Sequence, residues 1–171
     1  MGGGRVWCGV VGWRVRGRSA GPPRSEPVAE VSVAPNTKAL TPEELQRAEA
    51  LLPLLEGKQE FWAMGEFVHL GEPVLPVVTK ALAMPGPRIR YNAIETLSMI
   101  KSPAAVPALL DTAKLGTELP RIREHALRVA VRLDPMQAAP AIEAMAKDAN
   151  ASIRKAAAVE SRYVRRKEVI Q

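Results

Sequence analysis

The sequence contains few cysteine, histidine and aromatic residues, and each shortage limits what the protein can be. Its 171 residues include one Cys, two His, three Trp, two Tyr and two Phe. A single cysteine, Cys8, excludes an intramolecular disulfide and leaves no zinc ligand set. With so few aromatic side chains, the core must be built mainly from aliphatic residues.

Long apolar runs and phosphate-binding loops are also missing. The apolar run 6–13 is short, contains two glycines, and is followed by three arginines within residues 14–18. A membrane-spanning helix needs about 20 apolar residues, so we expect no membrane span. No strand is predicted, so no Gly-rich phosphate loop can follow one.

Residues 1–40 differ from the rest of the chain, because they are rich in Gly, Pro and Arg and carry six basic against two acidic residues. We expect a disordered basic leader over 1–40 and a folded body over 41–171. Residues 1–25 allow three interpretations: a secretory signal, an organellar transit peptide, or no targeting address. The apolar centre is short and glycines weaken an amphipathic helix, so we favour the last interpretation and a cytoplasmic location.

The folded body contains an internal repeat. Three Ile-Arg pairs each begin an amphipathic pattern, with 33 and then 31 residues between successive isoleucines: Ile89-Arg90, Ile122-Arg123 and Ile153-Arg154. This spacing is the length of one helix pair with its turns. The pattern therefore predicts an all-α array of stacked antiparallel helix pairs.

Alignment of these three segments predicts which residues are buried. Positions 4, 5, 8 and 11 after each Ile are almost all apolar and fall on one stripe of a helix. The columns are Ala93, Ala126 and Ala157; Ile94, Leu127 and Ala158; Leu97, Ala130 and Ser161; and Ile100, Leu133 and Val164. The intervening columns share no chemistry, so we expect them to face solvent or a partner.

Prolines mark the first helix of each of these pairs. Pro76, Pro107 and Pro140 precede the three repeated arginines by 14, 16 and 14 residues. The two extra residues of the middle interval fit in the loop 115–120. Asp148 lies between the two predicted helices of the last repeat, whereas Met84 stands at the corresponding place in the first of the three.

These features resemble the HEAT-repeat family, including its phycobilisome-lyase-like branch. In that family a proline bends the first helix, an Asp follows in the turn, and an Arg comes just after an apolar residue at the start of the second helix. The resemblance implies a short armadillo-type α-solenoid of about three and a half antiparallel helix pairs. It also implies structural roles for Arg90, Arg123, Arg154, Asp148, Pro76, Pro107 and Pro140.

We place the repeats at about 41–71, 72–102, 103–134 and 135–167. Thr41-Pro42-Glu43-Glu44 combines an N-cap hydroxyl, an N1 proline and an acid three residues after the cap, which predicts a helix start. In the first repeat Gln59 and Glu60 stand where Ile and Arg are expected, which indicates a degenerate, more polar end. The C-terminal edge lacks such a closure, so we expect either self-association or a missing continuation there.

Basic residues are concentrated on the predicted second helices of the last three repeats. Four acidic residues, Glu95, Glu124, Glu160 and Glu168, accompany twelve basic ones: Arg88, Arg90, Arg121, Arg123, Arg128, Arg132, Arg154, Lys155, Arg162, Arg165, Arg166 and Lys167. In proteins of this resemblance the second helices line the concave face. We therefore expect a positively charged groove that attracts an acidic segment or a phosphate backbone.

We interpret the chain as a non-enzymatic scaffold that binds an acidic protein segment on this face without a cofactor. Two alternatives stay open: a module that binds the phosphate backbone of a nucleic acid, and an accessory subunit similar to bilin lyases. Aromatic residues, Met and Arg are typical interface anchors. The candidate partner-binding residues are Tyr91, Glu95, Met99, Arg128, Arg132, Arg162 and Tyr163.

Catalytic signals are few. His69 lies near a predicted helix end, and His125 is expected on a helix surface. One HEAT-repeat family of dinuclear-iron hydroxylases uses several His-Glu pairs as ligands, whereas this chain has only the reversed pair Glu124-His125. A HEAT-like DNA glycosylase would need Trp and acidic residues in its groove, but Trp62 is the only tryptophan of the predicted body and lies in the first repeat. We therefore predict that the chain is not an enzyme and holds no metal.

Overall fold

The structure is a computed structural model, and it describes residues 39–168. These residues belong to one compact unit. The predicted disorder of the leader and its targeting interpretations therefore fall on residues outside the described part, apart from Ala39 and Leu40. Leu40 packs against the core.

The described residues contain helices and no strand, which confirms the all-α prediction. The α-helices are α1 (Pro42–Leu51), α2 (Glu60–Leu70), α3 (Leu75–Lys80), α4 (Pro87–Ile100), α5 (Val106–Lys114), α6 (Pro120–Leu133), α7 (Pro135–Met145) and α8 (Ala151–Glu168). Short 3-10 helices adjoin some of them: η1 (Leu52–Glu56), η2 (Glu72–Val74), η3 (Ala81–Ala83) and η4 (Pro103–Ala105). None of these helices is long and apolar enough to cross a membrane.

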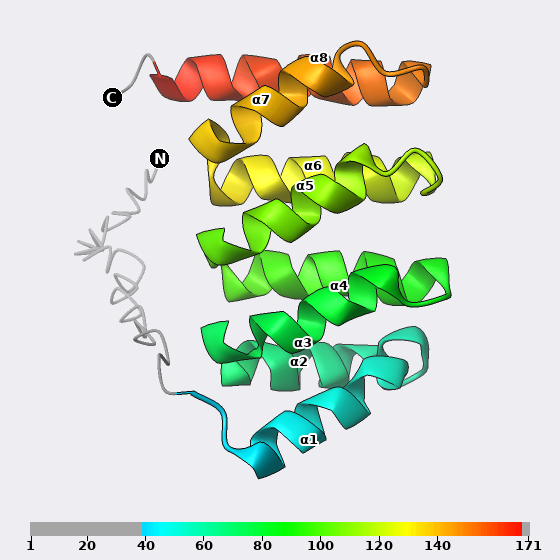
Figure 1. Cartoon of the computed structure of the whole chain (residues 1–171), viewed down its shortest axis with the longest axis vertical. Helices are drawn as coiled ribbons and strands as arrows, with labels where there is room; N and C mark the ends of the chain where they lie inside the picture. Colours follow the sequence, from blue (N-terminus) through cyan, green and yellow to red (C-terminus); the bar gives the residue numbers. More distant parts are fainter. Residues whose placement is uncertain (1–38, 169–171) are drawn as a thin grey trace, which may run out of the picture. The chain divides into compact units, whose positions relative to one another are not determined.

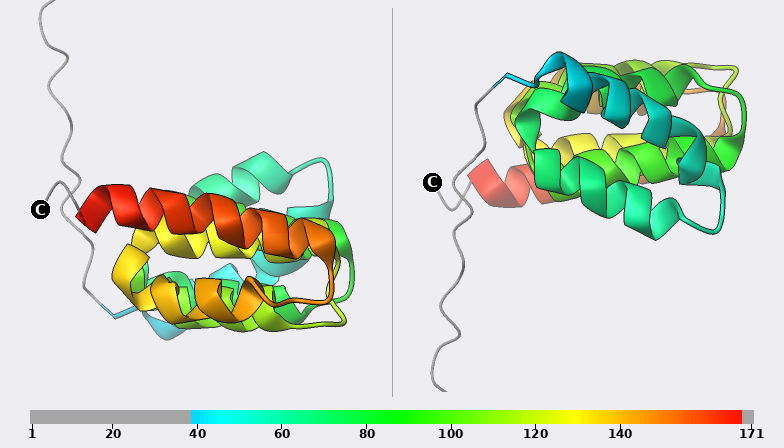
Figure 2. Two further views of the ribbon diagram at one scale, coloured as in Figure 1. Left: turned by 90° about the horizontal axis from the view of Figure 1, so that it is seen from above. Right: turned by 90° about the horizontal axis from the view of Figure 1, so that it is seen from below.

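The helices form four antiparallel pairs stacked in chain order (Figure 1). The first helices α1, α3, α5 and α7 form one layer, and the second helices α2, α4, α6 and α8 form the other (Figure 2). The predicted short α-solenoid is therefore confirmed. We call the outer surface of the layer made by α2, α4, α6 and α8 the second-helix face.

The array begins at the predicted cap. Thr41 Oγ1 accepts a hydrogen bond from the Glu44 backbone N–H at 3.2 Å, and Glu44 Oε2 accepts one from the Thr41 backbone N–H at 2.8 Å. This reciprocal pair satisfies donors that would otherwise lack a partner at the start of α1. Asp134 caps α7 in a similar way, since its Oδ1 accepts from the backbone N–H groups of Met136 and Gln137 at 3.0 Å.

The prolines shape the first-helix layer. Pro76 and Pro107 lie in the first turn of α3 and α5, each of which follows a short 3-10 helix, whereas Pro140 lies inside α7. A proline has no backbone N–H to donate and its ring crowds the preceding turn. The first two prolines therefore stand where a first helix changes from 3-10 to α geometry.

The apolar columns form the core between the layers. Ile89, Ile122 and Ile153 are buried, as are Ala93, Ala126 and Ala157. Ala158 is the exception, because it is exposed although Ile94 and Leu127 in the same column are fully buried. The described residues contain no helix pair beyond α7 and α8 that could cover it.

Arginines connect successive pairs. Arg90 donates from Nε and Nη2 to the carboxylate of Glu118 at 2.5 and 3.0 Å, and from Nη1 to the Met84 carbonyl at 2.9 Å. Arg123 donates from Nε to the Ala113 carbonyl at 2.8 Å and forms an ion pair with Asp148. Arg90 thus joins the turn of its own pair, and Arg123 the end of the first helix of its own pair, to an acid in the turn of the next pair.

Between the first and second helix pairs, which we call the first junction, the acid and the arginine exchange places. Glu60 occupies the place of the repeated arginine and accepts two hydrogen bonds from Arg88, both at 2.6 Å. Asn92 Nδ2 donates to the same carboxylate at 2.9 Å and to the Leu55 carbonyl at 2.6 Å. These hydrogen bonds lower the pKa of Glu60, with Arg88 as the largest cause.

Candidate functional site

The second-helix face carries three hollows. The first lies between α2 and α4 and has a volume of about 500 Å³. The second, about 410 Å³, is lined from α2, α4 and α6, and the third, about 390 Å³, lies between α6 and α8. Their linings come from the second helices, so these helices face open space on this side of the array.

The hollow between α2 and α4 is largely apolar. Phe61, on α2, is 80% exposed, and Met99, on α4, is 42% exposed. A methyl group added at Gly65 would meet no other atom within 4 Å, so the hollow is open at this glycine. The lining residues are Glu60, Phe61, Met64, Gly65, Tyr91, Asn92, Glu95 and Met99. Exposed aromatic and Met side chains in a concave site are typical of a binding surface for an apolar group.

The adjoining hollow is cationic. It shares Glu60, Tyr91 and Asn92 with the apolar hollow, and adds Arg88 and Arg121. Arg88 is held by Glu60, whereas Arg121 forms no ion pair with any described residue. The two hollows together therefore offer an apolar region that continues into one with an unpaired guanidinium group.

A buried histidine, His125, packs against Tyr91, which lines both hollows. The His125 ring stacks on Tyr91 with ring centroids 4.5 Å apart and an interplanar angle of 14°. Its Nε2 lies 3.0 Å from Oε1 of Glu95, and its Nδ1 has no hydrogen-bond partner among the described residues. The prediction that His125 lies on a helix surface is therefore wrong. Burial lowers the pKa of His125, against the opposing effect of the Glu95 carboxylate.

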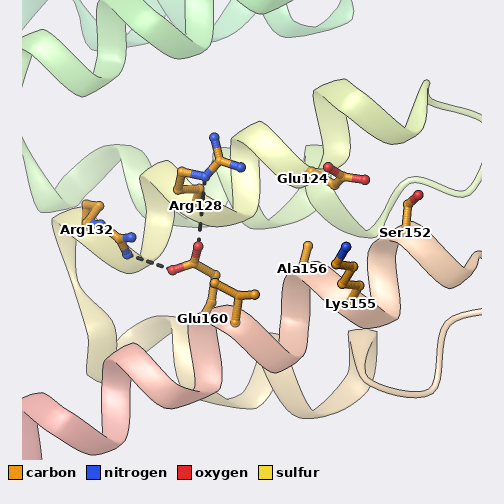
Figure 3. A pocket seen from close by; sticks show the side chains of 8 residues that line it. Glu124, Arg128, Arg132, Ser152, Lys155, Ala156 and Glu160 are labelled. Atoms are coloured by element: carbon orange, nitrogen blue, oxygen red, sulfur yellow. Dashed lines mark hydrogen bonds and ion pairs between the residues drawn. The ribbon is translucent and has the colours of Figure 1, made fainter.

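The third hollow is lined by basic and acidic side chains (Figure 3). Arg132 Nη1 donates to Glu160 Oε2 at 2.7 Å, and Arg128 Nε lies 3.9 Å from Glu160 Oε1. Lys155 lines the same hollow from α8. Because Glu160 is buried between the two helices, its carboxylate compensates part of the charge of both arginines.

The seven candidate partner-binding residues do not form one cluster. Tyr91, Glu95 and Met99 line the apolar hollow, and Arg128 and Arg132 line the third one. The Arg132 guanidinium carbon lies 3.9 Å from the ring centroid of Tyr163, which is a cation-π contact. Arg162 is exposed on α8 and donates to the Ala158 carbonyl at 3.3 Å.

The positive charge of these helices is partly compensated, which the sequence count could not reveal. Among the residues that the structure describes, five of the twelve basic residues pair with carboxylates: Arg88, Arg90, Arg123, Arg128 and Arg132. Their partners include Glu60, Glu118 and Asp148, which lie outside the segments counted in the sequence. The positive charge available to an anionic partner is therefore smaller than the number of basic residues suggests.

The His and acidic side chains do not form the metal centre of the dinuclear-iron hydroxylases that the family resemblance includes. Within residues 39–168, no three His, Cys, Asp or Glu side chains come close enough together to hold a metal ion. His125 instead contacts Glu95 and Tyr91. The described donor groups therefore do not fit that ligand set.

Sequence comparison does not assign a family, since no family model and no curated protein matches the chain. Solved structures do show similar folds. Human deoxyhypusine hydroxylase in complex with glycerol superimposes with a TM-score of 0.60 and 18% identity over 77% of this chain and 46% of that chain. The chain thus spans less than half of that protein.

A second similar structure is the complex of CpcE and CpcF of phycocyanin lyase from Nostoc sp. PCC7120. It superimposes with a TM-score of 0.53 and 23% identity, over 69% of this chain and 76% of that chain. These neighbours contradict two predictions, that the chain is a non-enzymatic scaffold for an acidic segment and that it is not an enzyme, because the first neighbour is an enzyme and the second belongs to a lyase. What the comparisons establish is the fold: the chain is an all-helical, HEAT-like solenoid.

Proposed function

We propose that the chain is an accessory subunit of a lyase-type enzyme, similar to bilin lyases, and that it holds a bilin on its second-helix face. The observation that carries this proposal is the apolar hollow between α2 and α4, which continues into a hollow lined by Arg121, a residue without an ion pair to any described residue. A bilin is a long conjugated molecule with carboxylate side groups. It would place its rings against the apolar lining and a carboxylate near the arginine.

The side chains of the two hollows suit such a ligand. Tyr91 lies in both hollows, and its ring is held in place by the stack on His125. Phe61 and Met99 add exposed apolar surface that a flat conjugated ligand would cover. The Arg121 guanidinium can donate two parallel hydrogen bonds to a carboxylate.

The structural comparison adds support from a different direction. The CpcE–CpcF complex of phycocyanin lyase shares this fold over 76% of the matched chain, so a solenoid of this size serves as one subunit of a lyase. By analogy we propose that the chain works together with a second subunit.

The test is direct binding of a bilin, with biliverdin as the probe and its induced circular dichroism as the signal. Gly65→Leu is the central variant, because it adds a side chain where the hollow is open and replaces a helix-interior glycine by a better helix former. We expect Gly65→Leu to weaken binding at least about tenfold without lowering stability. Arg121→Glu should weaken binding by a similar factor, since a charge-assisted hydrogen bond contributes roughly 1.5–3 kcal/mol.

Met136→Glu is the matched control. Met136 is an exposed methionine like Met99, but it lies on α7 in the other layer, so its substitution should leave binding unchanged while Met99→Glu weakens it. Absence of an induced signal with the unmodified chain would refute the proposal. Equal binding by Gly65→Leu, Arg121→Glu and the control would refute the placement of the ligand.

A further inference from the structure

Glu95 places a carboxylate in the wall of the apolar hollow between α2 and α4. It lies on α4 between Tyr91 and Met99, four residues from each, so the three side chains follow one line along the helix. All three line the hollow. The Glu95 side chain is 37% exposed, so a molecule that enters the hollow can reach its carboxylate.

Glu95 has no basic partner among the described residues. Within residues 39–168 its one ion-pair contact is with His125, whose Nε2 lies 3.0 Å from Glu95 Oε1, and no hydrogen bond reaches its Oε2. Glu60, the other acid of this hollow, accepts two hydrogen bonds from Arg88 and one from Asn92. Glu95 is therefore the acid of the apolar hollow whose charge is available to a ligand.

The neighbouring histidine does not cancel that charge. Burial and the charge of Arg128 lower the pKa of His125 from its ordinary value of 6.5, against the opposing effect of Glu95, so the imidazole is uncharged at neutral pH. The nearby arginines line other hollows: Arg128 lines the one between α6 and α8, and Arg121 lines the one that adjoins the apolar hollow. The negative charge of Glu95 thus acts mainly on the apolar hollow itself.

This arrangement limits the chemistry of a ligand that covers the hollow. A flat apolar molecule in contact with Tyr91 and Met99 also removes water from Glu95, which lies between them. A carboxylate that loses water without gaining a partner destabilises the complex. The ligand must therefore carry N–H donors or a positive charge close to its apolar rings, where Glu95 can accept a hydrogen bond from it.

We propose that Glu95 accepts hydrogen bonds from the pyrrole N–H groups of the bilin and selects the cationic form of its ring system. This inference rests on the proposed bilin site. In the neutral ring system one type of ring nitrogen carries no hydrogen, and a proton taken from solvent at that nitrogen gives the cation. An opposite charge within about 4–6 Å favours the protonated form. Glu95 would then bind the middle of the ligand, while Arg121 binds a carboxylate at its side.

The test is a pH titration of bound biliverdin followed by its absorption spectrum. Protonation of the conjugated ring system moves its long-wavelength absorption band to longer wavelength. We expect biliverdin to bind a proton more tightly on the unmodified chain than in free solution. Glu95→Gln should lower the proton affinity of the bound ligand at least about tenfold, because it removes the opposite charge. The induced circular dichroism should persist in this variant, since the glutamine Oε1 still accepts a hydrogen bond.

Two further variants assign the effect to Glu95. Glu124→Gln is the matched control, because Glu124 also has no ion pair with any described residue but lines the hollow between α6 and α8. It should leave the titration of bound biliverdin unchanged. His125→Phe keeps the carboxylate of Glu95 and an aromatic ring beside Tyr91, so the bound ligand should keep its raised proton affinity. A loss as large as that in Glu95→Gln would assign the effect to His125 and overturn the inference.

The two readouts separate this inference from the proposed function. An unmodified chain that gives no induced circular dichroism with biliverdin would refute the bilin site, and the role of Glu95 with it. An induced signal together with the same titration curve for Glu95→Gln and the unmodified chain would leave the bilin site in place and overturn the role of Glu95 alone.

Discussion

Substitution of Glu118 by alanine tests whether the arginine contacts between helix pairs stabilise the array. The change leaves the Arg90 guanidinium with the Met84 carbonyl alone and also removes the acceptor of the Leu119 backbone N–H, which donates to Glu118 Oε1 at 2.7 Å. The side chains of Arg90 and Glu118 are 18% and 4% exposed. Removing one partner of a buried pair costs about 3–5 kcal/mol, and partial access of water to Arg90 reduces this to about 2–3 kcal/mol.

For a folded body of about 130 residues, 1 kcal/mol shifts the melting temperature by about 3–5 °C. We therefore expect Glu118→Ala to melt about 6–15 °C below the unmodified chain in a thermal scan followed by circular dichroism. Glu49→Ala is the control, because Glu49 pairs with Lys80 on the surface and both side chains are about half exposed. Its loss should cost at most about 1 kcal/mol.

The double variant Arg90→Met with Glu118→Leu separates a lost ion pair from an uncompensated charge. It removes both charges and fills similar volumes, so it should recover most of the stability lost in Glu118→Ala. Equal shifts for Glu118→Ala and Glu49→Ala would show that this contact contributes no more than a surface pair. The ion pair of Arg123 with Asp148 would then also be expected to contribute no more than a surface pair.

Two further predictions concern α4 and α6. Leu97→Asp should unfold the chain or destabilise it by more than about 4 kcal/mol, because Leu97 is fully buried, whereas Met99→Asp on the same helix should cost less than about 1 kcal/mol in urea unfolding. Burial lowers the pKa of His125 in the folded state from its ordinary value of 6.5. Below pH 6.5 the unfolded chain therefore binds more protons than the folded one. The free energy of unfolding should therefore fall as the pH decreases through 6.5. The variant His125→Phe keeps an aromatic ring beside Tyr91 and should reduce this fall. Identical pH profiles for the two proteins would show that His125 does not cause it.

The repeat pattern predicted the fold from the sequence because its signals are local. The Ile-Arg pairs, the prolines and the caps at Thr41 and Asp134 each act within a few residues, so their meaning does not depend on distant partners. The burial predicted from the apolar columns was wrong at Ala158, because the prediction assumed a neighbouring helix pair on both sides. Periodicity identifies the apolar stripe that can be buried, but burial also requires a neighbouring helix pair that covers it.

The ion pairs between helix pairs and the contacts of the candidate site were harder to predict, because they join residues far apart in the chain. Glu118 bonds to Arg90 across 28 residues, and it lies in a loop of a different length from the turn that holds Asp148. A clue was present, since both acids precede a repeated arginine by five or six residues. The burial of His125 gave no such signal, because it depends on Tyr91 of the preceding pair.

The reversed polarity at the first junction restricts how this protein can change in length. Glu60 occupies the arginine position of its pair and relies on Arg88 of the following pair. If residues 72–102 were lost, Arg121 would take the place of Arg88 beside Glu60, but the buried Glu118 would lose Arg90 and would gain no arginine from the first pair. Loss of the second pair should therefore be poorly tolerated, even though solenoids commonly gain and lose units during evolution.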